Sequence, residues 1–473
     1  MWYKKIELSA HDFKKLNVYG RYEQNIQKAK QQGIRYKKIE EIRGCWFANP
    51  GIAIPYSKYI AGEPAEVYRK IRKYYLEGQK YTLIKEEYKQ FKNIRKKIKD
   101  IFELDEKKYK IIFEANGSVL VSLLTKLLKN ENNIALTFSD QGRLIYAALA
   151  NEEESIYKYV ANFEQQIRLF ESPLISNKIQ IKNPYPEKEK IRIIDIFNPN
   201  LTYKSDAQII DEYSKQILDP KIKIAFLLEV SRTGRILPIE ELIKITRQKR
   251  EDILIFVDGA QAIGRLSYEK IKRSIKLADG YLIVGHKALD GFVSAAMIIK
   301  NKIEELISKS IEKTKLFYLK IFRFESDELN EKTIFLAKKQ QREYYLISLP
   351  EAVCLKVALE DNKNNFFKEK LIISPYKQEI AEFLNAQKNI YLNVNRFNCV
   401  DDIIAFHTFP FEQAIAMKDF LQSLNPSITV APLTENLALR IGLDAKLPDL
   451  NFAIKYLKDS IKKFYNLNRK VSK

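Results

Sequence analysis

The stretch ILIFVDGAQAIGRLSYEKIKRSIKLADGYLIVGHKALDG, residues 253–291, places three polar side chains at the ends of apolar runs. A short β-branched run stops at Asp258, which predicts a buried parallel strand that carries a carboxylate at its carboxyl end. A second apolar run, residues 281–284, stops just before Lys287. Open α/β sheets bind ligands outside the carboxyl ends of their strands. We therefore expect Asp258 and Lys287 to face one ligand site.

A carboxylate and a lysine at neighbouring strand ends suit pyridoxal phosphate, because its aldehyde needs an amine and its ring nitrogen needs an anion. Asp258 would keep the ring nitrogen protonated, which makes the ring a stronger electron sink. Lys287 would form a Schiff base with the cofactor, and Gln261 would donate to its phenolic oxygen. The alternative is structural: a turn aspartate, a glutamine that caps a helix and a solvated lysine.

The motif D-G-A-Q-A (residues 258–262), followed by H-K-x-L-x-G (residues 286–291), resembles the class V, cysteine desulfurase-like branch of the fold type I pyridoxal-phosphate enzymes. The resemblance implies an α/β fold with a three-layer large domain around a mostly parallel sheet, and a smaller α+β C-terminal domain. It implies that Lys287 and Asp258 are catalytic and that His286 contacts the cofactor. It also implies a homodimer, because the site of this family lies at the subunit interface.

The order of predicted elements divides the chain into three parts. Residues 1–85 would contribute to the small domain and the active-site mouth, residues 86–325 would form the large cofactor-binding domain, and residues 326–473 would form the small domain. Helices are predicted over residues 65–88, 89–101 and 346–359. Short strands are predicted at residues 390–395, 402–407, 427–430 and 437–442.

A predicted strand at residues 110–113 leads through Asn116, Gly117 and Ser118 into an apolar helix. Unpaired backbone N–H groups and the helix dipole make such a turn an anion site, so these residues are expected to hold the cofactor's phosphate. An ordinary helix N-cap is the alternative.

The next predicted strand ends in Phe138, where the related family usually places an aromatic residue, often histidine, on the cofactor's face. This chain has Ser-Asp-Gln at residues 139–141 instead. Phe138, Gln141 or a residue that the sequence does not identify is therefore expected to cover the ring. The missing histidine weakens a desulfurase assignment.

Three residues are candidates for binding the substrate. Ser231 and Arg232 follow the apolar strand at residues 222–230 and are expected above the cofactor, with a surface charge as the alternative for Arg232. Arg440 matches an arginine that clamps the substrate α-carboxylate in the related family through a bidentate pair. A structural salt bridge is the alternative for Arg440.

Composition narrows the class of protein. The net charge of +21 invites a nucleic-acid interpretation, but the lysines are spread along the chain without a basic arm or zinc-ligand spacing, which makes nucleic-acid binding unlikely. The three cysteines, Cys45, Cys354 and Cys399, are far apart, so no disulfide framework or metal site is expected. No apolar run suits a signal peptide or a membrane span, and we expect a cytoplasmic protein.

Three functions remain open from the sequence. The first is a pyridoxal-phosphate enzyme acting on an amino acid or related amine, aminotransferase-like, with a lyase, desulfurase or epimerase reaction as alternatives. A desulfurase needs a thiol shortly before the strand of Arg440, and residues 432–436 contain none. The second is a non-catalytic binding subunit with the same fold. The third is a basic nucleic-acid-binding protein.

Overall fold

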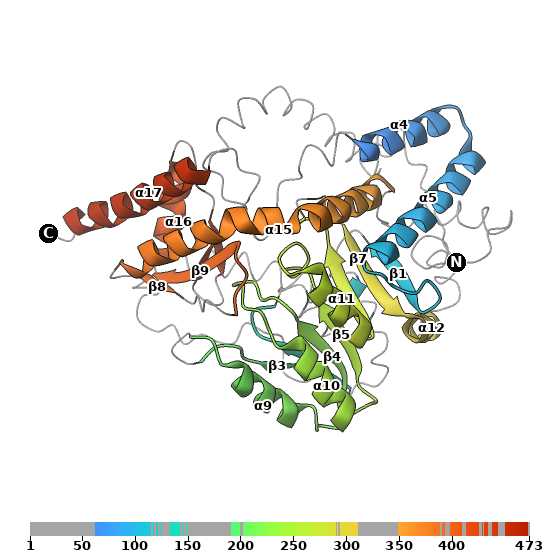
Figure 1. Cartoon of the computed structure of the whole chain (residues 1–473), viewed down its shortest axis with the longest axis horizontal. Helices are drawn as coiled ribbons and strands as arrows, with labels where there is room; N and C mark the ends of the chain where they lie inside the picture. Colours follow the sequence, from blue (N-terminus) through green and yellow to red (C-terminus); the bar gives the residue numbers. More distant parts are fainter. Residues whose placement is uncertain are drawn as a thin grey trace, which may run out of the picture.

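The computed structural model describes residues 62–310 and 349–471, with several short gaps and a longer one at residues 150–190. Residues 1–61, which include most of the segment predicted to reach the active-site mouth, lie outside the described residues. The described chain forms a large unit around a seven-stranded sheet and a small unit around a four-stranded sheet (Figure 1).

The large sheet has the strand order β1-β7-β6-β5-β4-β2-β3. Every neighbouring pair is parallel except those of β7, which is antiparallel to β1 and β6. The link from β6 to β7, residues 285–294, is too short for a crossover helix and therefore returns antiparallel. The strands are β1 (Tyr109–Glu114), β2 (Ile134–Phe138), β3 (Ile191–Ile194), β4 (Ile222–Leu228), β5 (Leu254–Asp258), β6 (Gly280–Val284) and β7 (Ala295–Lys300).

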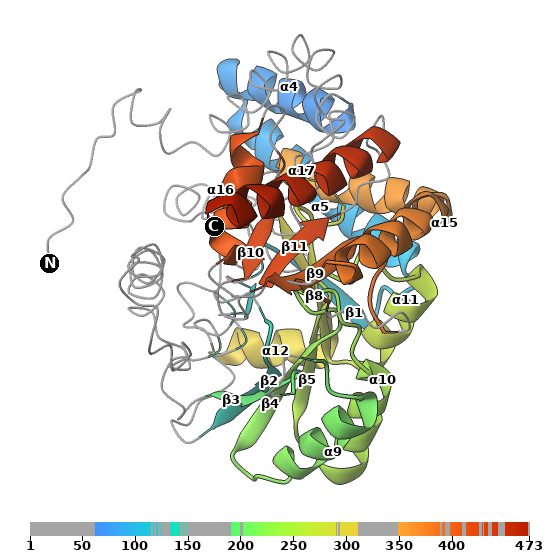
Figure 2. The same cartoon turned by 90° about the vertical axis from the view of Figure 1, so that its left-hand side faces the viewer.

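Helices cover both faces of the large sheet (Figure 2). One face carries α9 (Asp206–Gln216), α10 (Ile239–Lys249) and α11 (Tyr268–Leu277), and the other carries α12 (Asn301–Ser310). Alternate strand residues enter two apolar cores, as Val257 packs in the core with α11 and Phe256 in the core with α12. Strands buried on both faces appear in sequence as continuous apolar runs. The predicted three-layer α/β fold is confirmed.

The small unit is built on an antiparallel sheet of order β10-β11-β9-β8. Its strands are β8 (Ile390–Leu392), β9 (Ile403–Thr408), β10 (Ala431–Leu433) and β11 (Ala438–Gly442), with α16 (Gln413–Ser423) and α17 (Leu450–Val471) packed against them. The predicted α+β C-terminal domain is confirmed.

Helix α15 (Leu349–Asn385) belongs to both units. Its first part lies in the large core and packs against α4 (Glu63–Leu76) and α5 (Lys80–Ile101), whereas its last part lies in the core of the small unit. The predicted domain boundaries at residues 85 and 325 stay predictions. Within the ranges that the structure describes, no helix is both long and apolar enough to cross a membrane.

Three local predictions are wrong. The break in the first helical region falls between α4 and α5, where Gly78 has a φ of 68°, and not near residue 88. The helix predicted to end at residue 359 continues to Asn385. The strand predicted at residues 427–430 forms at Ala431–Leu433, where Pro432 is tolerated because β10 is an edge strand.

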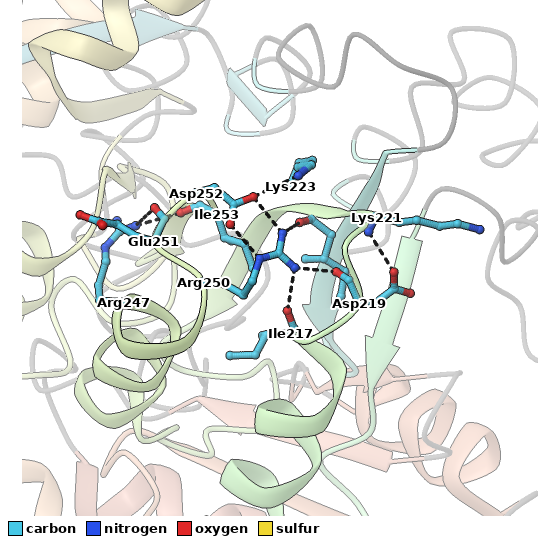
Figure 3. Close-up of polar contacts among 10 residues, drawn as sticks. Ile217, Asp219, Lys221, Lys223, Arg247, Arg250, Glu251, Asp252 and Ile253 are labelled. Atoms are coloured by element: carbon cyan, nitrogen blue, oxygen red, sulfur yellow. Dashed lines mark hydrogen bonds and ion pairs between the residues drawn. The ribbon is translucent and has the colours of Figure 1, made fainter.

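The amino edge of the large sheet, where β4 and β5 begin, is held together by Arg250. Its guanidinium donates to the carbonyl oxygens of Ile217, Asp219 and Ile222 at 3.2, 2.9 and 3.3 Å (Figure 3). Its Nε also pairs with Asp252 Oδ1 at 2.7 Å. The planar guanidinium has five donors, so one side chain can join the segment after α9, the start of β4 and the turn before β5.

Candidate functional site

Asp258 is the last residue of β5, and it is 3% exposed at the carboxyl edge of the large sheet, where β4, β5 and β6 end. Its Oδ1 accepts a hydrogen bond from the Ala260 backbone N–H at 2.8 Å. Burial raises the pKa of Asp258, while the charge of Lys287, the hydrogen bond from Ala260 and the side chain of Gln141 lower it. Burial disfavours the ionised form of Asp258, and a cation that faces the carboxylate would favour it.

The turn after Asp258 is shaped by close packing on Tyr281 of β6. A Cβ atom at Gly259 would lie 2.2 Å from the Tyr281 ring, so a larger residue requires the ring or the turn to move. The Tyr281 hydroxyl donates to Glu229 at 2.5 Å, and Ser274 donates to the same carboxylate at 2.6 Å. Burial raises the pKa of Glu229. This buried polar group supports the turn from beneath.

Lys287 lies in the link between β6 and β7, and β6 is the direct neighbour of β5. The link is closed by a hydrogen bond from Gly291 N to Gly285 O at 2.7 Å. Lys287 is partly buried, and its charge lowers the pKa of Asp258. The structure thus brings the predicted carboxylate and lysine together at one edge of the sheet.

His286 precedes Lys287 and is also partly buried. Burial, followed by the charge of Lys287, lowers the pKa of His286 to about 4, so the imidazole is neutral at pH 7. Its Nδ1 is buried and has no hydrogen-bond partner among the residues that the structure describes. A buried ring nitrogen without a partner is costly, and it is satisfied when a polar ligand atom reaches it.

Gln261 lies on the turn that follows Asp258, as predicted, and is buried. Its amide oxygen accepts a hydrogen bond from Arg265 Nη1 at 2.5 Å. A guanidinium has only donors, so the Gln261 amide oxygen must face Arg265. The Gln261 amide nitrogen then points away from Arg265. A hydrogen bond from Gln261 to a cofactor would come from this nitrogen and stays a prediction.

Gln141 is the nearer of the two predicted ring-covering residues to the site. It is buried, and its side chain lowers the pKa of Asp258. Phe138 instead points into the large core, where it stacks on Tyr213 of α9 with ring centroids 6.1 Å apart. Ser139 is directed to Asp195, which accepts its hydroxyl at 2.7 Å. Of these residues, Gln141 is the one whose side chain influences the pKa of Asp258.

The two substrate candidates after β4 differ in how their side chains are used. The Ser231 hydroxyl lies 2.9 Å from the Thr233 hydroxyl and accepts from Arg235 N at 3.1 Å, so it shapes its own loop. Arg232 Nε lies 3.6 Å from Asp140 Oδ1, and its side chain is only 15% exposed. Arg232 is therefore not a solvated surface charge, and both substrate-binding roles stay predictions.

Asp140 anchors this loop to the end of β2. Its Oδ2 accepts from the Thr233 backbone N–H at 2.8 Å and from the Thr233 hydroxyl at 2.7 Å. Its φ of 64° is left-handed, a conformation that Asp tolerates better than most residues. Asp140 thus holds Arg232 and Gln141 on adjacent segments of the same edge.

Several predicted site residues are described only in part. Gly117 is buried after β1, and a Cβ there would lie 3.2 Å from Leu282 of β6. Asn116 and Ser118 lie outside the described residues. Arg440 is placed as backbone in β11, paired with Ala431 and Ala405, and its side chain lies outside what the structure describes. The predicted phosphate turn and carboxylate clamp stay predictions.

Sequence reasoning missed Glu229, Asp140 and Arg265 as parts of the site. Glu229 had a signal, because it is the single acidic residue in the apolar run IKIAFLLEV and lies next to its end. Asp140 and Arg265 had none, since each acts on a partner from another segment. Throughout the described ranges, no group of three or more His, Cys, Asp or Glu side chains is arranged to hold a metal ion.

No model of a protein family matches this sequence, and no curated protein matches it. Solved structures do match the fold. A cysteine desulfurase from Thermococcus onnurineus NA1 is 14% identical, with a TM-score of 0.55, over 89% of this chain and 95% of its own. A variant of the protein C-DES with glycine covalently linked to its pyridoxal-phosphate cofactor is 13% identical, with a TM-score of 0.57, over 88% of this chain and 96% of its own.

A plant enzyme of different chemistry matches equally well. The 4-hydroxyphenylacetaldehyde synthase of Rhodiola rosea is 10% identical, with a TM-score of 0.58, over 89% of this chain and 83% of its own. Identities this low establish the fold and leave the reaction open. The chain has the fold type I architecture.

Proposed function

We propose that this protein is a pyridoxal-phosphate-dependent enzyme that acts on the amino group of an α-amino acid. One observation carries the proposal: the buried Asp258 carboxylate and Lys287 lie at the carboxyl ends of neighbouring strands, close enough for the lysine charge to act on the carboxylate. An amine and an anion at this edge are the two groups that the cofactor requires.

The residues at the site fit this cofactor. Asp258 is a buried anion that burial alone would neutralise, and a pyridinium nitrogen would offset that cost. The orphaned Nδ1 of His286 gives a polar ligand a partner next to Lys287. Gly117 follows β1 and packs tightly on β6, where a Cβ would lie 3.2 Å from Leu282, and we propose that it belongs to the phosphate site. The cofactor-bearing structure of C-DES shares this fold.

Pyridoxal phosphate, when bound, supplies an aldehyde that captures amines and a ring that accepts electrons. In this proposal Lys287 would hold the aldehyde covalently and would move protons at the substrate carbon. Asp258 holds a proton on the ring nitrogen, and the support from Glu229 and Tyr281 keeps its turn in place. Gln141 would lie over the ring, where relatives of the sequence motif often place a histidine.

The substrate class follows from the available cations. Arg232 is largely buried beside Asp140, on the loop that follows β4. Arg440 lies in β11 of the small unit. We assign the carboxylate clamp to Arg440, with Arg232 as the second candidate, because a bidentate guanidinium pair selects a carboxylate over a neutral group. We further propose a homodimer as the working assembly.

Two reaction types divide the proposal. Transamination is the first, and a carbon–sulfur lyase reaction is the second because a cysteine desulfurase shares this fold. A desulfurase with its own thiol is disfavoured, since residues 432–436 hold no cysteine. Two incubations separate these reactions. A transaminase should form a new amino acid from L-alanine and a 2-oxo acid. A carbon–sulfur lyase should form pyruvate and a persulfide from L-cystine alone.

An absorption spectrum tests the cofactor. Purified protein mixed with pyridoxal phosphate should show a visible band that borohydride abolishes, leaving a covalent adduct on the peptide with Lys287. Lys287→Ala should lose both, whereas Lys272→Ala, at an ion pair with Glu103 on the surface, should keep them. If the wild-type protein does not bind added pyridoxal phosphate, the enzyme proposal is overturned in favour of a non-catalytic binding subunit.

A further inference from the structure

A short segment of the small unit, residues 398–403, rests on the site edge of the large unit. Ile236 N donates to Asn398 O at 2.6 Å, and Val400 N donates to Gly234 O at 2.9 Å. These bonds attach the segment to the loop that carries Arg232. The segment then leads directly into β9 (Ile403–Thr408), so the small sheet begins where it touches the site.

The same segment makes a buried ion pair with the turn after β5. Arg265 Nε lies 2.5 Å from Asp402 Oδ2, with the two side chains 4% and 16% exposed. Burial raises the pKa of Asp402, and the charge of Arg265 lowers it. A buried pair leaves a costly lone charge when either partner is removed, so each unit needs the other at this contact.

Arg265 also reaches Gln261, one turn back along the chain. Its Nη1 donates to the side-chain oxygen of Gln261 at 2.5 Å and to the backbone oxygen at 3.3 Å. An amide can rotate so that its oxygen and nitrogen exchange places, but only the oxygen can accept from a guanidinium. Arg265 therefore decides which way the Gln261 amide faces.

The far end of this chain of contacts is anchored in α15. Lys377 donates to the carbonyl oxygens of Val400 and Cys399 at 2.7 and 3.3 Å. Its Nζ also lies 3.6 Å from Asp401 Oδ1. Since α15 belongs to both units, the position of Asp402 is set by the packing of the small unit as a whole.

We propose that Arg265 is a positioning residue through which Asp402 of the small unit sets the orientation of the Gln261 amide. The inference deepens the proposed function, on which it rests for the identity of the cofactor. Correct seating of the small unit turns the Gln261 nitrogen toward the cofactor's phenolic oxygen. Without this seating the amide is free to rotate and the donor is lost for part of the time.

The first test follows the visible band of the lysine-bound cofactor as pH changes. A donor to the phenolic oxygen stabilises its anionic form, so losing the donor should raise the pH midpoint of the band. Gln261→Leu should raise it most, and Asp402→Asn and Arg265→Lys should raise it by at least 0.5 unit in the same direction. Arg273→Gln, at a surface pair with Glu240, should leave it unchanged. Unchanged midpoints in both relay variants would overturn the proposal.

The second test needs no cofactor and separates this inference from the proposed function. Ala262 N and Ile263 N donate to Gly259 O within the turn that Arg265 holds. In cofactor-free protein, hydrogen exchange of a peptide covering residues 259–266 should be at least ten times faster in Asp402→Asn than in wild type. A peptide covering β4 should exchange at the wild-type rate. Equal exchange in the turn would sink the relay even if the wild-type protein binds the cofactor.

Discussion

The two edges of the large sheet use charge in opposite ways. At the amino edge, Arg250 and Lys223 both bind Asp252, and these contacts hold the pKa of Asp252 well below its usual range. At the carboxyl edge, burial raises the pKa of Asp258 and lowers that of His286 to about 4. The amino edge favours the charged forms of its residues, whereas the carboxyl edge disfavours them.

The difference indicates which edge has a function beyond stability. Charges at the amino edge have several protein partners each, so they hold segments together. Burial at the carboxyl edge shifts two groups away from their charged forms, which is the arrangement found at binding and catalytic sites. A ligand with a cationic ring would reverse the cost at Asp258. The following predictions test this contrast, beginning with the largest effect.

Asp258→Asn should bind the cofactor and lose turnover by roughly 100- to 1,000-fold, the usual loss on removing one preorganised electrostatic group. The amide cannot hold the ring proton as a carboxylate does. Steady-state kinetics with the best amino acid substrate measure the loss. The matched control is Asp252→Asn at the amino edge, which should keep kcat within a factor of two or so. Equal kcat values in the two variants would contradict a catalytic role that is confined to the carboxyl edge.

Arg250→Ala should lower the free energy of unfolding by about 2–3 kcal/mol, because three carbonyl oxygens lose a charged donor. Urea unfolding gives the loss as a lower midpoint at unchanged slope. The position of the cofactor band should not move, since the carboxyl edge is untouched. If Arg250→Ala shifted the cofactor band and left the free energy of unfolding unchanged, the stabilising role assigned to Arg250 at the amino edge would be wrong.

His286→Gln tests the carboxyl edge through pH. The folded pKa of about 4 lies below the ordinary 6.5, so between these values only the unfolded chain binds the proton. Wild-type stability therefore falls as pH drops from about 6.5 to about 4, by at most about 1.4 kcal/mol per unit, and is unaffected above this window. Urea unfolding of cofactor-free protein should show a flatter pH profile for His286→Gln. Parallel profiles would refute a buried, neutral His286.

Arg273→Ala marks the smallest effect. Its side chain is 56% exposed, and its Nε lies 2.9 Å from Glu240 Oε1. Exposed ion pairs contribute little, so the loss in unfolding free energy should stay under about 0.5 kcal/mol. Urea unfolding beside Arg250→Ala provides the comparison. A loss as large as that of Arg250→Ala would mean that exposure does not explain the strength of the amino edge.

Local pattern in the sequence determined much of the fold. Strands β4, β5 and β6 are apolar runs, broken in β4 only by Lys223 near its start, because both of their faces are buried, and such runs are visible without a structure. Asp258 and Lys287 were identifiable for the same reason, since each polar residue ends such a run. The helix break at Gly78 and the edge strand that contains Pro432 could not be identified from the sequence. The effect of a glycine or a proline depends on which segments pack beside it, and these are known only from the fold.

The tertiary structure alone decided which polar side chains meet. Gln141 lowers the pKa of Asp258, although the two residues are far apart in sequence. Asp140 accepts a hydrogen bond from Thr233 across a similar separation. Arg265 had no signal in the sequence, and only the folded chain places Asp402 of the small unit against it. Periodicity records only how a residue relates to its own strand or helix. Contacts between distant segments depend on how the layers pack, so their partners cannot be identified from the pattern along one chain.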